Sequence, residues 1–152
     1  MTRFVLPVLI AAALAPASAV AQASPEARLK ELGVTLPAAA PPLANYVRAV
    51  RTGNLVFLAG HGPGQPWGPT ATGKLGKDLT IPQGAEAARN VGINMLASLK
   101  AEIGDLGKVT RIVKVLGMVN ATEDFTQHPE VINGFSDLMV AVFGEKGKHA
   151  RS

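Results

Sequence analysis

The chain has 152 residues, 47% of them apolar, with a net charge of +4 and no cysteine. This length suits one domain with an appendage better than two domains, because single domains typically reach roughly 100–150 residues. The absence of cysteine excludes disulfides, cysteine zinc sites, iron–sulfur clusters and thiol nucleophiles. The positive charge is mild, and a nucleic-acid surface needs clustering as well as an excess of positive charge, so we expect no nucleic-acid partner.

Residues 1–23 have the pattern of a secretory signal peptide. Arg3 precedes an uncharged apolar run over residues 4–14, and small residues then alternate up to Ala23. Pro7 and a weakly apolar second half argue against a membrane anchor, since a span needs about 20 strongly apolar residues. We expect cleavage after Ala23, export to the periplasm or out of the cell, and no stable membrane anchor afterwards.

Residues 24–42 predict a short helix followed by a stiff connector. Ser24 suits a helix N-cap and Pro25 the first helical position, and Gly33 suits the helix end. The proline-rich stretch Pro37–Pro42 then predicts an irregular segment that leads into the main domain, residues 43–152.

The first half of the main domain predicts a β-hairpin and a long loop. Tyr46–Val50 and Leu55–Ala59 are β-rich runs, and residues 51–54 between them include a glycine and an asparagine. Gly60–Gly76 is rich in glycine and proline and predicts a loop. Leu75–Thr80 predicts a short strand.

The second half predicts two helices around a long strand. Apolar residues at helical spacing indicate a helix over Pro82–Ile103, and a β-branched run indicates a central strand over Val109–Val119. A second helix begins at Pro129, with Gly144 as its end. The nine residues after that helix contain a single alanine as apolar content and predict no further strand. The fold class is therefore α+β, a mixed β-sheet with two helices packed on one face.

Local motifs for common chemistries are incomplete. A GxxxxGK stretch ends at Lys74, but Leu75 stands where a phosphate-binding loop needs serine or threonine. His61, His128 and His149 lack metal-ligand spacing, so we expect no metal site. No Gly-x-Ser-x-Gly elbow supports a hydrolase triad. The basic residues near the end of the chain read as a solvated tail.

Several segments between residues 43 and 152 together resemble the RidA/YjgF family, also described as endoribonuclease L-PSP-like proteins. The matching segments lie in the same order as in the family: residues 45–50, 53–60, 72–74 with Asp78, 83–90, 109–115, 124–125, Asn133 and 149–152. The residue pattern of the last segments resembles a divergent, exported branch of this family.

The resemblance implies a RidA/chorismate-mutase-like fold assembled as a homotrimer, with active sites in clefts between subunits. It implies hydrolysis of reactive 2-imino or enamino acids to 2-keto acids and ammonia, without metal or cofactor. The expected partner is an imino or enamino acid or another small carboxylate.

The resemblance also indicates the site residues. Arg151 matches the catalytic arginine that clamps the substrate carboxylate, a role that suits its planar two-pronged guanidinium. Tyr46 matches a tyrosine lining the pocket, Asn133 a site-proximal asparagine, and Gly60 the glycine at a strand end. His61 departs from the family, where glutamine is common, as does the alanine before Gly60.

The family continues past the Ala-Arg-Ser motif with strands that position a water and carry a glutamate. This implies that residues 43–152 form an incomplete, C-terminally truncated domain with the last strands missing, a frayed Arg151 and impaired activity. One alternative is a non-catalytic trimer that binds small carboxylates or acts like a chaperone. A second alternative is an endoribonuclease, which the mild charge and the lack of a basic-aromatic stripe disfavour.

Overall fold

The computed structural model describes residues 23–64 and 72–152. All but the last residue of the predicted signal peptide, and most of the GxxxxGK stretch, lie outside these described residues. Within the two described ranges, no helix is both long and apolar enough to cross a membrane.

Helix α1 covers Pro25–Glu31, as predicted. The Ser24 hydroxyl accepts a hydrogen bond from a first-turn amide at 3.1 Å, which caps the helix. Leu29 is buried in the main core, and the Arg28 guanidinium donates to the Ala141 carbonyl at 3.3 Å. The N-terminal helix is therefore part of the domain and packs on the last long helix.

The predicted hairpin is present, but its first strand is shifted. Strand β1 covers Ala49–Thr52 and pairs antiparallel with β2, Leu55–Leu58. The connection is therefore only two residues long, and Gly53 takes a positive φ of 55° there. The prediction that a strand starts at Tyr46 is wrong. Arg48 instead hydrogen-bonds the carbonyls of the proline-rich connector and holds the preceding segment away from the hairpin.

The short strand predicted over Leu75–Thr80 is not formed. Lys74 accepts backbone hydrogen bonds from the following residues, and Gly76 turns the chain with a φ of 86°. Leu75 makes only isolated bridges, to Leu79 and Ala121. The turn chemistry of glycine therefore overrides the apolar pattern at this point.

The two long helices are confirmed. Helix α3 covers Ile81–Ile103, and Thr80 with Gln83 forms a reciprocal capping box at its start. Helix α4 covers His128–Phe143, one residue earlier than predicted, and Gly144 ends it as expected. Helix α4 has no side-chain cap at its start and instead carries a proline in its first turn, so the two helices begin with different local signals.

Helices α3 and α4 pack against each other and form the main core. The buried side chains of this core include Leu96, Leu99, Phe135, Leu138, Met139 and Val142. Small residues let the helices approach closely: a Cβ added at Gly134 would collide with the Ala85 backbone. A short 3-10 turn, Leu106–Lys108, follows α3, and another, Gly144–Gly147, follows α4.

A strand forms after the second helix, although none was predicted there. Strand β4, Ala150–Arg151, pairs in parallel with β3, Lys114–Val115. The tight turn at Gly144–Gly147 reverses the chain, so only a few residues are needed between α4 and β4. The predicted strand over Val109–Val119 is much shorter than expected, because β4 offers so short a partner.

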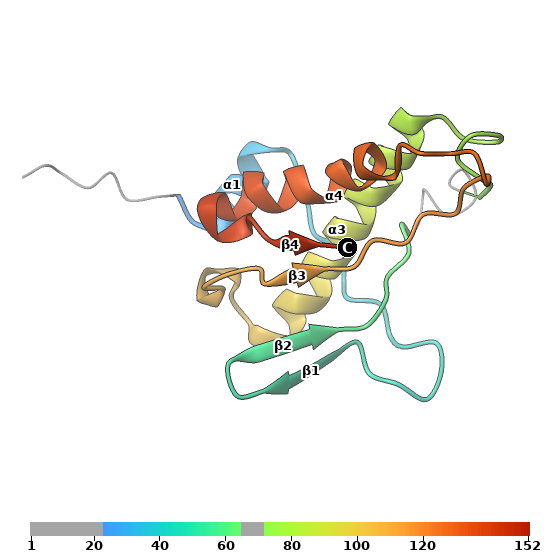
Figure 1. Ribbon diagram of the computed structural model, residues 1–152. Coiled ribbons are helices and arrows are strands. Elements are labelled where there is room, and N and C mark those ends of the chain that lie inside the picture. Colours follow the sequence, from blue (N-terminus) through green and yellow to red (C-terminus); the bar gives the residue numbers. More distant parts are fainter. Residues whose placement is uncertain (1–22, 65–71) are drawn as a thin grey trace, which may run out of the picture.

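The resulting architecture is α+β, as predicted (Figure 1). The described strands form two small sheets, β1–β2 and β3–β4, with β3 on the side of β4 toward the hairpin. Alternation along β2 turns Val56 and Leu58 toward the main core and leaves Leu55 and Phe57 exposed. The helices therefore cover one face of the strands, and the opposite face is apolar and open.

Candidate functional site around Arg151

Arg151 lies in strand β4 and is held by the backbone on both sides. The Ala150 amide donates to the Val113 carbonyl at 3.1 Å, and the Ser152 amide donates to the Val115 carbonyl at 3.1 Å. The expectation of a frayed Arg151 is therefore wrong. Its Cα is fixed by strand pairing, so its side chain starts from a defined point.

The Arg151 side chain reaches across to helix α4. One guanidinium nitrogen, Nη1, donates to Asn133 Oδ1 at 2.9 Å and to Ser136 Oγ at 3.1 Å. Asn133 and Ser136 are three residues apart and share one face of the helix. The structure thus brings together two of the predicted site residues, Asn133 and Arg151.

These contacts define which part of Arg151 remains available. Both hydrogens of Nη1 are engaged, whereas Nε and Nη2 donate to no residue in the described ranges. Nε and Nη2 form one edge of the guanidinium, and such an edge matches the two oxygens of a carboxylate. Arg151 is exposed, so this edge is open to a ligand.

The site carries uncompensated positive charge. The side chains of Asn133 and Ser136 are neutral, and within residues 23–64 and 72–152 no carboxylate forms an ion pair with Arg151. The nearby Lys148 pairs with Glu145 at 2.7 Å. A guanidinium held by neutral partners favours an anionic ligand.

His149 contacts the site through Ser136 and was not among the site residues predicted from the sequence. Its Nδ1 lies 2.7 Å from the Gly147 carbonyl, and its Nε2 lies 3.1 Å from Ser136 Oγ. Its ring meets the Phe135 ring edge-on, with centroids 6.2 Å apart. His149 and Arg151 are two residues apart and so project from one side of an extended strand, a signal that could have linked them.

His61 forms a similar arrangement elsewhere in the fold. Its Nδ1 lies 2.7 Å from the Ala59 carbonyl, and its Nε2 lies 2.7 Å from the buried Ser98 hydroxyl. The ring therefore ties the end of β2 to α3. A role in the fold accounts for His61 without a ligand.

Gly60, the predicted strand-end glycine, is exposed, and its backbone conformation does not require glycine. Its φ is not positive, and an added Cβ would meet no atom within 4 Å. No turn or close approach within the described chain needs glycine at this position.

Tyr46 interacts only with its own segment among the described residues. Its phenol accepts a hydrogen bond from the Leu43 amide at 3.5 Å, and the Arg48 guanidinium lies 6.0 Å from its ring centre. The side chain is 42% exposed. In the described part of one chain, neither Tyr46 nor Gly60 contacts Arg151, so these two predicted site residues are not joined to the arginine.

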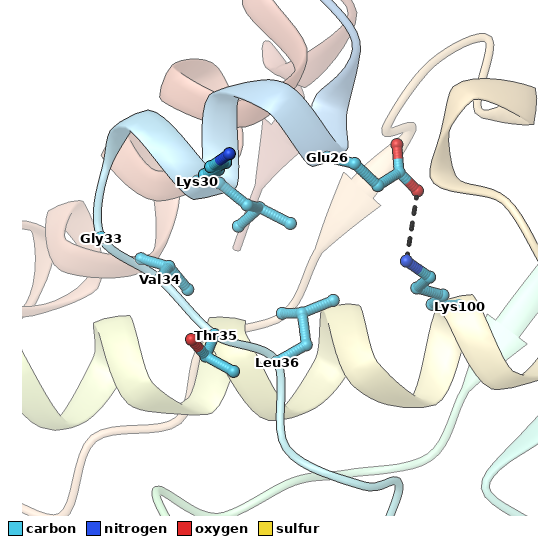
Figure 2. A pocket seen from close by; sticks show the side chains of 8 residues that line it. Glu26, Lys30, Gly33, Val34, Thr35, Leu36 and Lys100 are labelled. Atoms are coloured by element: carbon cyan, nitrogen blue, oxygen red, sulfur yellow. Dashed lines mark ion pairs between the residues drawn. The ribbon is translucent and has the colours of Figure 1, made fainter.

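A separate groove of about 420 Å³ lies between α1 and α3 (Figure 2). Leu29, Val34 and Leu36 form its apolar side, and Glu26 pairs with Lys100 across it at 3.6 Å. The Glu26 carboxylate also accepts a backbone hydrogen bond at 3.1 Å. The groove contains none of the predicted site residues, and two of its charged side chains, Glu26 and Lys100, pair with each other.

Other ionisable groups do not extend the site. A hydrogen bond from the Thr122 side chain lowers the pKa of Asp124, assisted by the Asp124 backbone, but Asp124 is fully exposed in a turn. Across the described ranges, no three His, Cys, Asp or Glu side chains are grouped as metal ligands.

The fold and the arginine site together define a small α+β protein with an open guanidinium edge, and comparison with known proteins gives the family. Residues 26–152 match the family model described as "YjgF/chorismate mutase-like, putative endoribonuclease". The chain therefore belongs to the YjgF/chorismate mutase-like family, which confirms the resemblance found in the sequence.

Individual relatives agree with this assignment. The chain is 42% identical over 135 residues to Protein TCP17 of Trypanosoma cruzi, covering 88% of this chain and 84% of TCP17. Among solved structures, it is similar to protein Atu1372 of Agrobacterium tumefaciens, described as of unknown function, with 40% identity and a TM-score of 0.76. That match covers 84% of this chain and 78% of Atu1372.

A second solved structure has a higher TM-score. It is described as a putative endoribonuclease from Shewanella oneidensis, with 33% identity and a TM-score of 0.81. The match covers 85% of each chain. These two structures also support the mixed α+β fold.

Proposed function

We propose that this protein binds small carboxylates at Arg151 and hydrolyses reactive 2-imino or enamino acids to 2-keto acids and ammonia. The observation that carries the proposal is the open Nε–Nη2 edge of Arg151, left free by neutral partners that hold Nη1. The resemblance to imine deaminases supports the reaction class, and the arginine geometry supports the carboxylate part of the substrate.

The proposed reaction adds one water to the C2 carbon of the protonated imine. An enamino acid first gains a proton at C3 and becomes this imine. The C–O bond then forms, one proton of the added water passes to the nitrogen, and the C–N bond breaks as ammonia leaves. The second water proton returns to solvent, and the oxygen becomes the ketone. Arg151 would hold the neighbouring carboxylate and so restrict the substrate to one orientation, which converts binding energy into positioning. Neither oxidation nor reduction is involved.

We also propose that the complete site forms between subunits of a homotrimer. Tyr46 and Gly60 are exposed, and neither contacts Arg151 within the described part of the chain. A neighbouring copy could bring these residues to the arginine. The open apolar face, which includes Val50 and Phe57, supports assembly, because contiguous exposed apolar surface marks interaction sites.

The test is an imine-hydrolysis assay with 2-aminoacrylate generated in the reaction mixture. The wild-type protein is expected to accelerate the appearance of pyruvate and ammonia. Arg151→Ala is expected to abolish the acceleration, and Arg151→Lys to retain little of it, because an ammonium lacks the two-pronged edge.

Arg51→Ala is the matched control, because Arg51 is exposed and its side chain bonds only the nearby Gly53 carbonyl. It is expected to behave as wild type. Calorimetric binding of pyruvate separates an enzyme from a binder: pyruvate binding without imine hydrolysis would leave only the carboxylate site. Arg151-dependent cleavage of RNA, with neither pyruvate binding nor imine hydrolysis, would favour the endoribonuclease alternative.

A further inference from the structure

Arg151 is the outer member of a hydrogen-bonded chain that reaches the interior. Its Nη1 meets Ser136 Oγ at 3.1 Å, Ser136 Oγ meets His149 Nε2 at 3.1 Å, and His149 Nδ1 meets the Gly147 carbonyl at 2.7 Å. Ser136 and His149 are both partly buried. Neither was among the predicted site residues.

The direction of each bond follows from the chemistry of the groups. A carbonyl only accepts, so His149 Nδ1 carries a hydrogen and, in the neutral ring, Nε2 accepts. The Ser136 hydroxyl hydrogen therefore points to His149. The lone pairs of Ser136 Oγ are then directed away from the ring, where one receives the Arg151 Nη1 hydrogen.

We propose that Ser136 and His149 are positioning residues that determine which edge of Arg151 faces the ligand. His149 orients the Ser136 hydroxyl, Ser136 with Asn133 holds Nη1, and the Nε–Nη2 edge remains available for a carboxylate. This inference rests on the proposed carboxylate site, and it states which ligands that site would select. A held guanidinium selects a planar ligand that approaches that edge with two oxygens.

The anchoring contacts of His149 keep the chain of bonds in place. Gly147 is buried, and a Cβ added there would collide with the Met139 carbonyl, so the accepting peptide is seated against α4. Phe135 is also buried and holds the imidazole edge-on. The ring of His149 is thus fixed by its backbone partner on one side and by an aromatic side chain on another.

The fold offers a matched control at the other histidine. Ser98 and His61 repeat the same arrangement, with an imidazole held by the carbonyl two residues earlier and by a helix serine. No arginine donates to Ser98 within the described residues. Ser98→Ala therefore removes an equivalent hydroxyl without touching the Arg151 chain.

The first experiment is NMR of the arginine side chains in the ligand-free protein. Fixed Nη1 bonds are expected to slow rotation about the Cζ–Nη1 bond and give Arg151 resolved Nη signals, which Arg151→Lys identifies by their loss. Ser136→Ala and His149→Phe are expected to average those signals, while Ser136→Thr and Ser98→Ala keep them. Averaged signals in the wild type would overturn the inference.

The second experiment is calorimetric binding of pyruvate to the same variants. Ser136→Ala and His149→Phe should each weaken affinity roughly 3- to 10-fold, which corresponds to the net contribution of one hydrogen bond. The double variant should bind pyruvate no more weakly than the worse single variant, because both residues act through the same series of hydrogen bonds. Ser136→Thr should restore affinity.

The two levels of the proposal fail in different ways. Wild-type protein that does not bind pyruvate would contradict the proposed function, while the NMR signals would still decide the positioning of Arg151. Pyruvate binding that needs Arg151 but is unaffected by Ser136→Ala would overturn the positioning role alone. An equal loss of affinity in Ser98→Ala would show a general effect on the fold and would also overturn it.

Discussion

Arg151 shows how neutral side chains can prepare a charged one for a ligand. Asn133 and Ser136 engage one nitrogen without cancelling the positive charge, so the rest of the guanidinium can still attract an anion. A carboxylate in the place of either partner would itself form an ion pair with Arg151 and neutralise that charge. We therefore expect the side chain at position 133 to influence the proposed carboxylate binding at Arg151.

Asn133→Asp is expected to weaken pyruvate binding by about tenfold or more, because the new carboxylate would compete with the ligand for Arg151. Asn133→Ala should weaken binding less, since it removes one neutral contact and leaves the charge free. Isothermal titration calorimetry of the two variants measures the difference. Equal losses would contradict the role of charge at this position.

Gly60→Ala tests whether a ligand approaches the end of β2. A Cβ at Gly60 or at Gly62 meets no atom within 4 Å, and neither has a positive φ, so both substitutions should leave the melting temperature nearly unchanged. If Gly60 lines the assembled site, Gly60→Ala should lower imine hydrolysis severalfold while Gly62→Ala does not. Identical activities would remove Gly60 from the site.

At the scale of elements, the decisive contact is between α3 and α4. The site face of α4, which carries Asn133 and Ser136, is placed by the packing of its other face on α3. That packing depends on close approach at Gly134, where a side chain would collide with the Ala85 backbone. The position of α4, and hence of the site, depends on this small residue.

Gly134→Ala is expected to destabilise the protein by about 1–3 kcal/mol, the typical cost of overpacking, although alanine normally favours a helix. Gly84→Ala is the comparison, because the atoms nearest to its added Cβ would belong to the side chains of Leu75 and Val131. It should cost less, since side chains can move more easily than backbone. Urea denaturation of both variants gives the free energies, and a more stable Gly134→Ala would contradict the packing.

At the scale of the whole molecule, the strands have one covered face and one open face. Val50 and Phe57 are paired across the hairpin and are 54% and 59% exposed. Leu116 and Met118 beside β3 are 69% and 85% exposed. Exposed apolar side chains of this kind mark interaction surfaces. The unpaired edges of the two small sheets are a second feature that favours contact with another subunit.

Phe57→Asp is expected to shift the protein to a smaller species in sedimentation velocity, because a charge would be buried at the proposed subunit contact. It should also lower imine hydrolysis if the site is shared between subunits. Leu32→Asp is the control, since Leu32 is an exposed apolar residue at the end of α1, outside the strand face. A wild-type protein that sediments as a monomer would contradict the proposed trimer.

The accuracy of the sequence predictions followed the range of the interactions involved. Helices α3 and α4 were predicted nearly to the residue, because apolar periodicity, Pro129 and Gly144 are local signals in the sequence. The strands were predicted less well, because strand length depends on a partner that lies far away in the chain. The same reason explains why Ser136 and His149 were missed: they meet only after α4 and β4 are in place.

The sequence by itself, with its length, low charge and lack of cysteine, determined one small α+β domain without disulfides, and its motifs indicated the family and Arg151. Only the tertiary structure decided that the nine residues after α4 include a strand, and which edge of Arg151 is free. The physical reason is that capping and periodicity are local properties of the chain. Strand pairing and the hydrogen bonds of Arg151 instead join residues that only the folded backbone brings together.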